Sequence, residues 1–275
     1  MYDDVLLAID GSEVAAGAAA VGLSLAQTLN ATVHVLSVVE SKRGDGTARE
    51  RREADVETVV SEAQDAGCAA EGVLRNGRPA TEISQYAEEA DVDLIVVGTH
   101  GRTGLKQVVL GSVALEVIRD AQQPVLSVSG AVARNDVGGD IDDVCLATDG
   151  WSGSAAATEH ALELADACDA RLHALYAVDV GSEDDTIRGG FEEHGAQTTA
   201  AVTDRAEDRG LEASGSVASG SAHEVILEYA ETADIDLLVM GTESKSNLER
   251  LVIGSVSQRV VPNASVPVLT ARTLE

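Results

Sequence analysis

An internal repeat is the feature that most limits how this chain can fold. At one constant offset, Asp10-Gly11 near the start aligns with Asp149-Gly150 in the middle. A slightly larger offset aligns the later parts of the two copies, in the pairs Gly77/Gly220, Ile83/Ile226, Tyr86/Tyr229, Asp91/Asp234, Gly98/Gly241 and Pro124/Pro267. Each copy is long enough to bury a core of its own. The sequence therefore predicts two domains of one fold, at 1–130 and 141–275, joined by a linker at 131–140 that contains Gly, Asn and Asp.

Within each copy, short apolar runs alternate with segments of helical spacing. In the first copy the runs predicted to be strands are Val5–Ile9, Thr32–Val39, Ala69–Leu74, Asp93–Val97 and Val125–Val128. The predicted helices are Glu13–Leu29, Pro79–Ala90 and Val113–Asp120, and a charged segment at Ser41–Glu53 leads into another helix that closes near Gly67. This alternation predicts βαβ units and hence an α/β fold, with a parallel sheet covered by helices on both faces.

The fourth predicted strand of each copy runs directly into a segment that begins with glycine. These segments read GTHGRTGLKQVVLGS at Gly98–Ser112 and GTESKSNLERLVIGS at Gly241–Ser255. Glycine lets backbone N–H groups approach an anion closely, and a helix N-terminus adds further donors and a partial positive charge. Both segments are therefore candidate phosphate sites.

Asp10 follows the first predicted strand. In open α/β sheets a ligand binds beyond the carboxyl ends of the strands, where the strand order reverses. If the first and fourth strands are neighbours there, Asp10 and Gly98 face one crevice, which suits a nucleotide whose ribose or phosphate-bound metal meets the carboxylate. The alternative is that Asp10-Gly11 is only a turn and a helix cap. Because the glycine segment accompanies Asp10, we favour the ligand role.

The spacing Gly98-x-x-Gly101, with Gly111-Ser112 nine residues further on, follows a DLIVV strand and accompanies Asp10. This combination resembles the ATP-binding branch of the universal stress protein (UspA) family, and because both halves show it, the chain resembles a tandem member. The resemblance implies an open five-stranded parallel sheet in each half, in the order 3-2-1-4-5, of the adenine-nucleotide alpha-hydrolase-like type. It also implies ATP, or ADP or AMP, bound between strands one and four.

The resemblance also implies roles for individual residues. Asp10 would contact the ribose or a Mg²⁺ or Mn²⁺ ion on the phosphates, and the backbone at Val38 would meet adenine. The residues that would surround ribose and phosphates are Gly98, Gly101, Gly111 and Ser112, and Ser112 would also cap the next helix. Arg102 is placed for phosphate contact, although an exposed charge is the alternative.

The second half keeps most of this pattern. The corresponding residues are Asp149, Ala177, Gly241, Ser244, Gly254 and Ser255. Ser244 replaces the second glycine, and if that position needs a positive φ, serine costs about 1 kcal/mol there and adds bulk. The sequence therefore predicts a weakened second site.

Charge excludes several classes of partner. The chain carries a net charge of −28, and only three of its basic residues are lysines. A field of that sign repels phosphate backbones and anionic lipids, so we expect neither nucleic acid nor membrane as a partner. Such a surface is typical of proteins that work in very high salt, as in a halophilic archaeon, although a merely acidic cytosolic protein is the alternative. The start of the chain resembles no secretory signal, which predicts a cytoplasmic protein.

Two local contrasts distinguish the halves. The segment Ser41–Glu53 has a net charge of +2 and its counterpart Val180–Glu193 is acidic. We expect arginines of the basic segment, among them Arg52, to attract phosphates to the first half, although a solvated helix face is the alternative. Trp151 stands where the first copy has Ser12, and it either narrows the second pocket or covers the surface.

These observations predict a regulatory stress protein that binds adenine nucleotide. No acid–base pair and no activated nucleophile is evident, so any ATP hydrolysis would be slow. The alternatives are an ATPase or nucleotidyl transferase, or an interaction scaffold without nucleotide. Family dimers pair their last strands, so the resemblance implies that Val125–Val128 and Val266–Thr270 pair within this chain, as an intramolecular pseudo-dimer. It leaves a further homodimer open.

Overall fold

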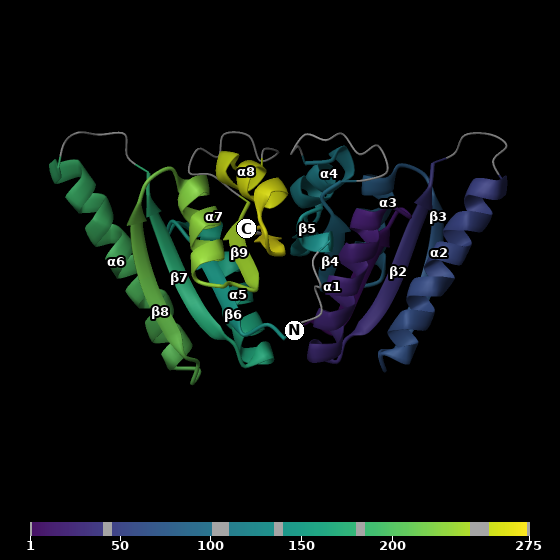
Figure 1. Ribbon diagram of the computed structural model, residues 1–275, viewed down its shortest axis with the longest axis horizontal. Helices are drawn as coiled ribbons and strands as arrows, with labels where there is room; N and C mark the ends of the chain where they lie inside the picture. The colour runs from purple at the N-terminus through teal and green to yellow at the C-terminus, as the bar shows by residue number, and fades with distance from the viewer. Residues whose placement is uncertain are drawn as a thin grey trace. The chain divides into compact units, whose positions relative to one another are not determined.

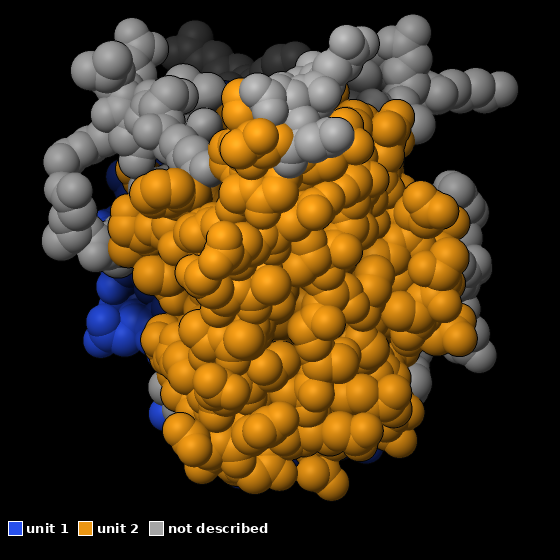
Figure 2. Space-filling model, turned by 90° about the vertical axis from the view of Figure 1, so that its left-hand side faces the viewer, with its two compact units in different colours: residues 1–139 blue, residues 140–275 orange. Residues whose placement is uncertain are grey.

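The computed structural model of the chain describes residues 2–40, 46–100, 110–134, 140–179, 185–242 and 253–273. The chain divides into two compact units, Met1–Gly139 and Asp140–Glu275, which we call unit 1 and unit 2. Figure 2 colours the described residues of unit 1 blue and those of unit 2 orange.

Both units have the same order of strands and α-helices (Figure 1). Unit 1 consists of β1 (Asp4–Ile9), α1 (Glu13–Leu29), β2 (Thr32–Val39), α2 (Gly46–Asp65), β3 (Ala70–Asn76), α3 (Pro79–Glu89), β4 (Leu94–Gly98), α4 (Ser112–Asp120), β5 (Val125–Val128) and the 3-10 helix η1 (Val132–Arg134). Unit 2 consists of β6 (Asp143–Ala147), the 3-10 helix η2 (Ser152–Ser154), α5 (Ala155–Cys168), β7 (Arg171–Val178), α6 (Asp185–Glu207), β8 (Ala213–Ser219), α7 (Ala222–Thr232), β9 (Leu237–Gly241), α8 (Ser255–Asn263) and β10 (Val268–Ala271).

The strands of each unit form a parallel sheet with one reversal of strand order. In unit 1 the order is β3-β2-β1-β4-β5, and in unit 2 it is β8-β7-β6-β9-β10. In each unit the reversal lies between the first and the fourth strand, because the chain turns back there to fill the other side of the sheet. The predicted α/β fold with two tandem parallel sheets is confirmed.

Register shows which helices cover which face of the sheet. Leu7 pairs with Val35, which pairs with Gly72, so these residues share one face. That face is covered by α1 and α2, since Gly22 of α1 lies against Leu7 and Val56 of α2 lies against Gly72. The opposite face contains His34 of β2, which contacts Tyr86 of α3. Unit 2 follows the same rule: α6 lies over β8 and α7 reaches β7.

The core of both units consists largely of small and aliphatic side chains. Leu6, Leu94, Leu146, Leu172 and Leu237 are at most 1% exposed. Burial of such side chains supplies most of the stabilisation of a fold of this kind. Among the helices that the structure describes, none is both long enough and apolar enough to cross a membrane.

Two local expectations need correction. The segment Ser41–Glu53 is not an irregular lead-in throughout, because α2 already begins at Gly46. Its alanine, arginine and glutamate residues have high helix propensity, which explains the earlier start. The region expected to be a plain linker also contains η1, and Ala133 of η1 packs closely on Gly17 of α1.

Candidate functional site

The strand reversal of unit 1 brings the predicted site residues together. β1 and β4 are neighbours, with Ala8 opposite Val97, and β1 also pairs with β2, with Ile9 opposite Ser37. Asp10, Val38 and Gly98 therefore lie side by side at the carboxyl ends of three adjacent strands, which we call the carboxyl edge of unit 1.

Asp10 begins a tight turn into α1. Its Oδ1 accepts a hydrogen bond from the Ser12 N–H at 3.0 Å, and the Ser12 hydroxyl accepts one from the Ala15 N–H at 3.2 Å. Gly11 between them has φ of +70°, a conformation that favours glycine. The turn and cap function of Asp10 is thus real, and any ligand contact would use the same carboxylate.

Helix α2 brings a charged pair over this turn. A Cβ placed on Gly11 would lie 2.6 Å from Oδ2 of Asp55 and 2.9 Å from Nη1 of Arg52. The two side chains lie 3.8 Å apart, and Arg52 is only 9% exposed. Of the basic segment, Arg49 and Arg51 are exposed on the solvated face of the helix, while Arg52 is buried beside the strand ends.

The Gly98–Ser112 segment is held by backbone hydrogen bonds where it leaves β4 and where it enters α4. The Gly111 N–H donates to the Thr99 carbonyl at 2.7 Å, and the Thr99 N–H donates to the Val128 carbonyl at 2.9 Å. Gly98 is required for close packing, because a Cβ there would lie 3.2 Å from the backbone nitrogen of Ala15. Gly101 and Arg102 lie outside the described residues.

Helix α4 begins without a side-chain cap. The prediction that Ser112 caps it is wrong: Gly111 is the N-cap residue, and Ser112 is the first helical residue and is exposed. Because glycine is also accepted at N-caps, the Gly-Ser pair could start the helix at either residue. The N-cap residue therefore supplies no side-chain acceptor to the first turn of α4, and N–H groups at a helix start favour an anion.

Unit 2 repeats the frame of this site. Asp149 Oδ1 accepts from the Trp151 N–H at 3.0 Å, Gly150 has φ of +74°, and Ala177 occupies the position of Val38. The Gly254 N–H donates to the Thr242 carbonyl at 2.8 Å. Gly254 is the N-cap of α8, and Ser255 is its exposed first residue. Ser244 lies outside the described residues.

The surroundings of Gly241 differ from those of Gly98. A Cβ on Gly241 would lie 2.7 Å from the carbonyl oxygen of Gly153, which belongs to η2. Unit 1 presents the first turn of α1 at this place, whereas unit 2 inserts η2 before α5. The strand end of unit 2 therefore faces a carbonyl oxygen, which disfavours a phosphate.

Over the turn of unit 2 lie Thr198 and His194 in place of the Arg52–Asp55 pair, since a Cβ on Gly150 would lie 2.5 Å from Oγ1 of Thr198 and 3.3 Å from Nε2 of His194. By the two repeat offsets, Ser37 and Arg52 correspond to Tyr176 and Gly195. The ring of Tyr176 fills the space, since a Cβ on Gly195 would lie 2.6 Å from its Cδ1. Burial, and then the charge of Asp149, raise the pKa of Tyr176. His194 lies between Tyr176 and Trp151, with ring centroids 5.6 Å from each.

A metal ion at either carboxyl edge would need a bound nucleotide to supply part of its coordination. Among the described residues there is no group of three or more His, Cys, Asp or Glu side chains that could hold an ion. Asp10 alone does not make a metal site. A Mg²⁺ or Mn²⁺ ion would have to take most of its ligands from phosphate oxygens and water.

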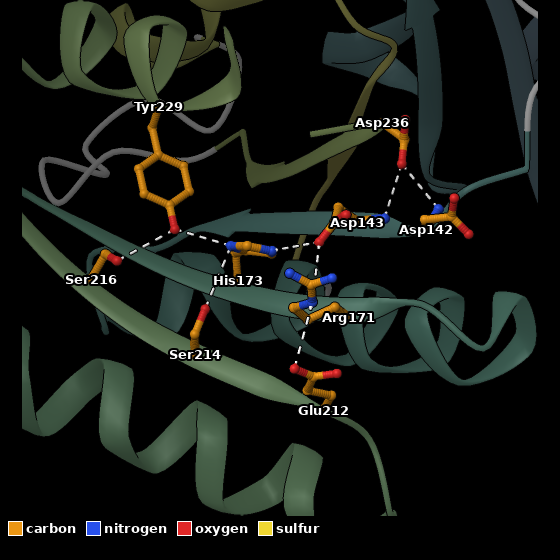
Figure 3. A network of polar contacts seen from close by, with 9 residues as sticks. All are labelled: Asp142, Asp143, Arg171, His173, Glu212, Ser214, Ser216, Tyr229 and Asp236. Carbon is orange, nitrogen blue, oxygen red and sulfur yellow. Dashed lines mark hydrogen bonds and ion pairs between the residues drawn. The ribbon is translucent and has the colours of Figure 1, made fainter. Parts of the chain in front are cut away.

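A second polar network lies on the other side of each sheet, toward the amino ends of the strands. In unit 2, His173 Nε2 is 2.7 Å from Asp143 Oδ1, and its Nδ1 is 3.0 Å from the Tyr229 hydroxyl (Figure 3). Asp236 accepts the backbone N–H groups of Asp142 and Asp143. Unit 1 repeats the network, with His34 between Asp4 and Tyr86.

This amino-edge network consists of buried, mutually paired polar groups that stabilise the fold. His173 and His34 are each 7% exposed, and both ring nitrogens of each have partners. Burial, followed by a hydrogen bond to Glu71, raises the pKa of Tyr86, so its hydroxyl stays protonated at neutral pH. Buried polar groups that are fully paired fix the packing of a core.

Removal of the Tyr229 hydroxyl is expected to lower the free energy of unfolding by about 1–2 kcal/mol. Tyr229→Phe leaves the His173 Nδ1 and Ser216 Oγ without this partner. Tyr86→Phe is the matched variant in unit 1, and it should cost more because its hydroxyl donates to the charged Glu71. Urea unfolding measures both. Unchanged stability of both variants would contradict a structural role.

The sequence analysis did not identify two residue pairs at the carboxyl edges, Ser37 and Arg52 in unit 1 and Tyr176 and Gly195 in unit 2. It grouped Arg52 with exposed arginines, and it did not connect Tyr176 with Gly195. A signal was present, because both members of the pair change together between the two copies. Residues that change together in this way are candidates for spatial contact.

Comparison with known proteins finds one family over both units. The pattern of the universal stress protein family matches residues 1–129 and again 141–272. A universal stress protein of Methanocaldococcus jannaschii is 34% identical over 137 residues, covering 47% of this chain and 81% of that protein. One from Bacillus subtilis is also 34% identical, over 147 residues, covering 46% of this chain and 99% of that protein.

Solved structures extend the likeness to both units. The crystal structure of a universal stress protein from Archaeoglobus fulgidus matches with a TM-score of 0.77 at 22% identity. It covers 99% of this chain and 97% of its own. At this identity the match supports the fold alone.

Proposed function

The chain belongs to the universal stress protein family, with one family domain in each unit, and we propose that it acts as a stress-response regulator. Its ligand in this proposal is an adenine nucleotide (ATP, ADP or AMP) bound mainly in unit 1. The observation that supports the proposal most is the strand reversal, which places Asp10, Val38 and Gly98 at one carboxyl edge. As part of this proposal, the two domains work as one intramolecular pair in the cytoplasm.

The residues of unit 1 fit a nucleotide. The uncapped first turn of α4, at Gly111 and Ser112, offers N–H donors to phosphate oxygens. The buried guanidinium of Arg52 lies beside Gly11, where Asp55 at 3.8 Å partly balances its charge. Asp10 is placed to accept a hydrogen bond from a ribose hydroxyl or to contact a metal ion on the phosphates. The backbone at Val38 would border the base, and Gly101 and Arg102 would complete the phosphate side.

Unit 2 is expected to bind polyphosphate more weakly. Its carboxyl edge has Gly195 in place of Arg52, and its Gly241 faces the Gly153 carbonyl oxygen. Ser244 in place of the second glycine acts in the same direction. We therefore expect about one ATP per chain, not two.

Asp10→Ala is expected to weaken ATP binding by about tenfold or more, because a hydrogen bond to a carboxylate is among the stronger ones. The matched variant Asp149→Ala should change ATP affinity less than about twofold. Equilibrium dialysis with labelled ATP in high salt measures both affinity and stoichiometry. The ATP-dependent rise in the unfolding temperature gives an independent readout.

The other outcomes separate the alternative functions. Mass spectrometry of ligand released from the purified protein should find an adenine nucleotide. An absence of nucleotide, with no effect of ATP on the unfolding temperature, would favour an interaction scaffold. Steady hydrolysis that Asp10→Ala abolishes would favour an ATPase. Equal loss in the Asp10 and Asp149 variants would contradict the assignment to unit 1.

A further inference from the structure

The carboxyl edge of unit 2 has the construction of a stacking site for a planar ring. Trp151 stands at this edge, four residues after β6, and is 51% exposed. Trp151 is also the only tryptophan of the chain. A half-exposed indole offers a large apolar surface at the position where a ligand of this fold would lie.

The backbone of Trp151 is held firmly. Its N–H donates to Asp149 Oδ1 at 3.0 Å, and its carbonyl accepts from the Ser154 N–H at 2.9 Å and from the Ser154 hydroxyl at 2.8 Å. The Ser154 hydroxyl also accepts from Thr148 at 3.0 Å. The backbone of Trp151 is thus already ordered and need not be ordered when a ligand binds.

His194 supports the indole from α6. Its ring lies 5.6 Å from that of Trp151 at 37°, and 5.6 Å from that of Tyr176 at 81°. Its Nε2–H donates to the Asp149 carbonyl at 3.3 Å. Three rings are therefore packed in sequence from the core to the surface, and the buried Tyr176 anchors the row.

The charges at this edge disfavour phosphate. Asp149 lies beside the rings, and exposed Glu192 and Glu193 precede His194 on α6. The positions of Arg52 and Asp55 in unit 1 are held here by the uncharged Gly195 and Thr198. The N–H of Ala156, at the start of α5, is taken by the Thr273 hydroxyl at 3.4 Å. The described residues next to Trp151 thus offer an aromatic face and acceptors, whereas the N–H donors of this edge lie at the start of α8.

We propose that unit 2 binds the base of an uncharged purine nucleoside, such as adenosine, by stacking it on Trp151. Unit 1 would then recognise phosphates, while unit 2 would recognise the base without them. This inference rests on the proposed function only in assigning the ligand to the nucleotide class.

The test is a titration of the full chain with adenosine, followed by Trp151 fluorescence. Because Trp151 is the sole tryptophan, the signal reports on unit 2 alone. Saturable quenching by adenosine is expected, with ATP binding about tenfold more weakly at the same site. Trp151→Ala should weaken adenosine binding in equilibrium dialysis by about tenfold or more, and Trp151→Phe should restore most of it.

The controls separate the two proposals. Asp10→Ala should leave the adenosine response of Trp151 unchanged even if it removes ATP from unit 1. ATP binding to unit 1 with no response of Trp151 to adenosine would overturn only this inference. A response to ATP that is as strong as the response to adenosine would also overturn it. An adenosine response without any ATP binding would contradict only the proposed function.

Discussion

Gly195→Arg is expected to lower the free energy of unfolding of unit 2 by about 3 kcal/mol, and addition of Tyr176→Ser is expected to recover most of that loss. The first substitution forces a side chain into the ring of Tyr176, which a Cβ alone would approach to 2.6 Å. The second recreates the Ser37 and Arg52 pair of unit 1. Adding Thr198→Asp would supply the counterpart of Asp55 and so pair the new guanidinium.

Helix α6 provides its own control. Gly190 is exposed and a Cβ on it would meet no atom within 4 Å. Gly190→Arg should therefore be neutral or stabilising, by up to about 1 kcal/mol from helix propensity. Urea unfolding followed by Trp151 fluorescence measures each variant. Two outcomes would contradict an energetic coupling between Tyr176 and Gly195. One is that Gly195→Arg is as stable as Gly190→Arg, and the other is that adding Tyr176→Ser recovers no stability.

Raising KCl from about 0.1 M to about 2 M is expected to raise the unfolding temperature by about 10 °C or more. The chain carries a net charge of −28, and unfolding separates these charges. The Debye length falls from about 10 Å to less than 3 Å over this range, so salt removes most of the repulsion between surface carboxylates. Thermal unfolding at several salt concentrations measures the effect.

A charge variant shows whether repulsion is the cause. Helix α6, which begins in the acidic segment Val180–Glu193, exposes Glu192, Glu193 and Glu207. Their replacement by glutamine should raise the unfolding temperature at low salt and reduce its dependence on KCl. An unfolding temperature that does not change with salt in either protein would argue that the acidic surface does not limit stability.

Much of the fold could be predicted from the sequence because the relevant signals are local. Apolar runs that end at Asp10 and Gly98 define strands, and the repeat shows that one unit occurs twice. The position of the candidate site followed from these two residues, since parallel strands place their carboxyl ends on one edge. The extent of the unit 1 sheet and the reversal between β1 and β4 agree with that reasoning.

The details that were missed depend on partners far apart in the chain. Whether Arg52 or Arg51 points inward is decided by how α2 lies on the sheet, and neighbouring residues do not reveal it. The role of Gly195 depends on Tyr176 of another element. The start of α4 could not be predicted for a different reason, because glycine and serine are both accepted as N-cap residues.

The amino-edge network is the same in both units. Asp4, His34 and Tyr86 of unit 1 recur as Asp143, His173 and Tyr229, with the same contacts. The opposite edge differs between the copies, with Arg52 in unit 1 and the row Tyr176, His194 and Trp151 in unit 2. The two copies therefore agree at one end of the sheet and differ at the other. If the proposed function holds, one scaffold thereby serves two different ligands.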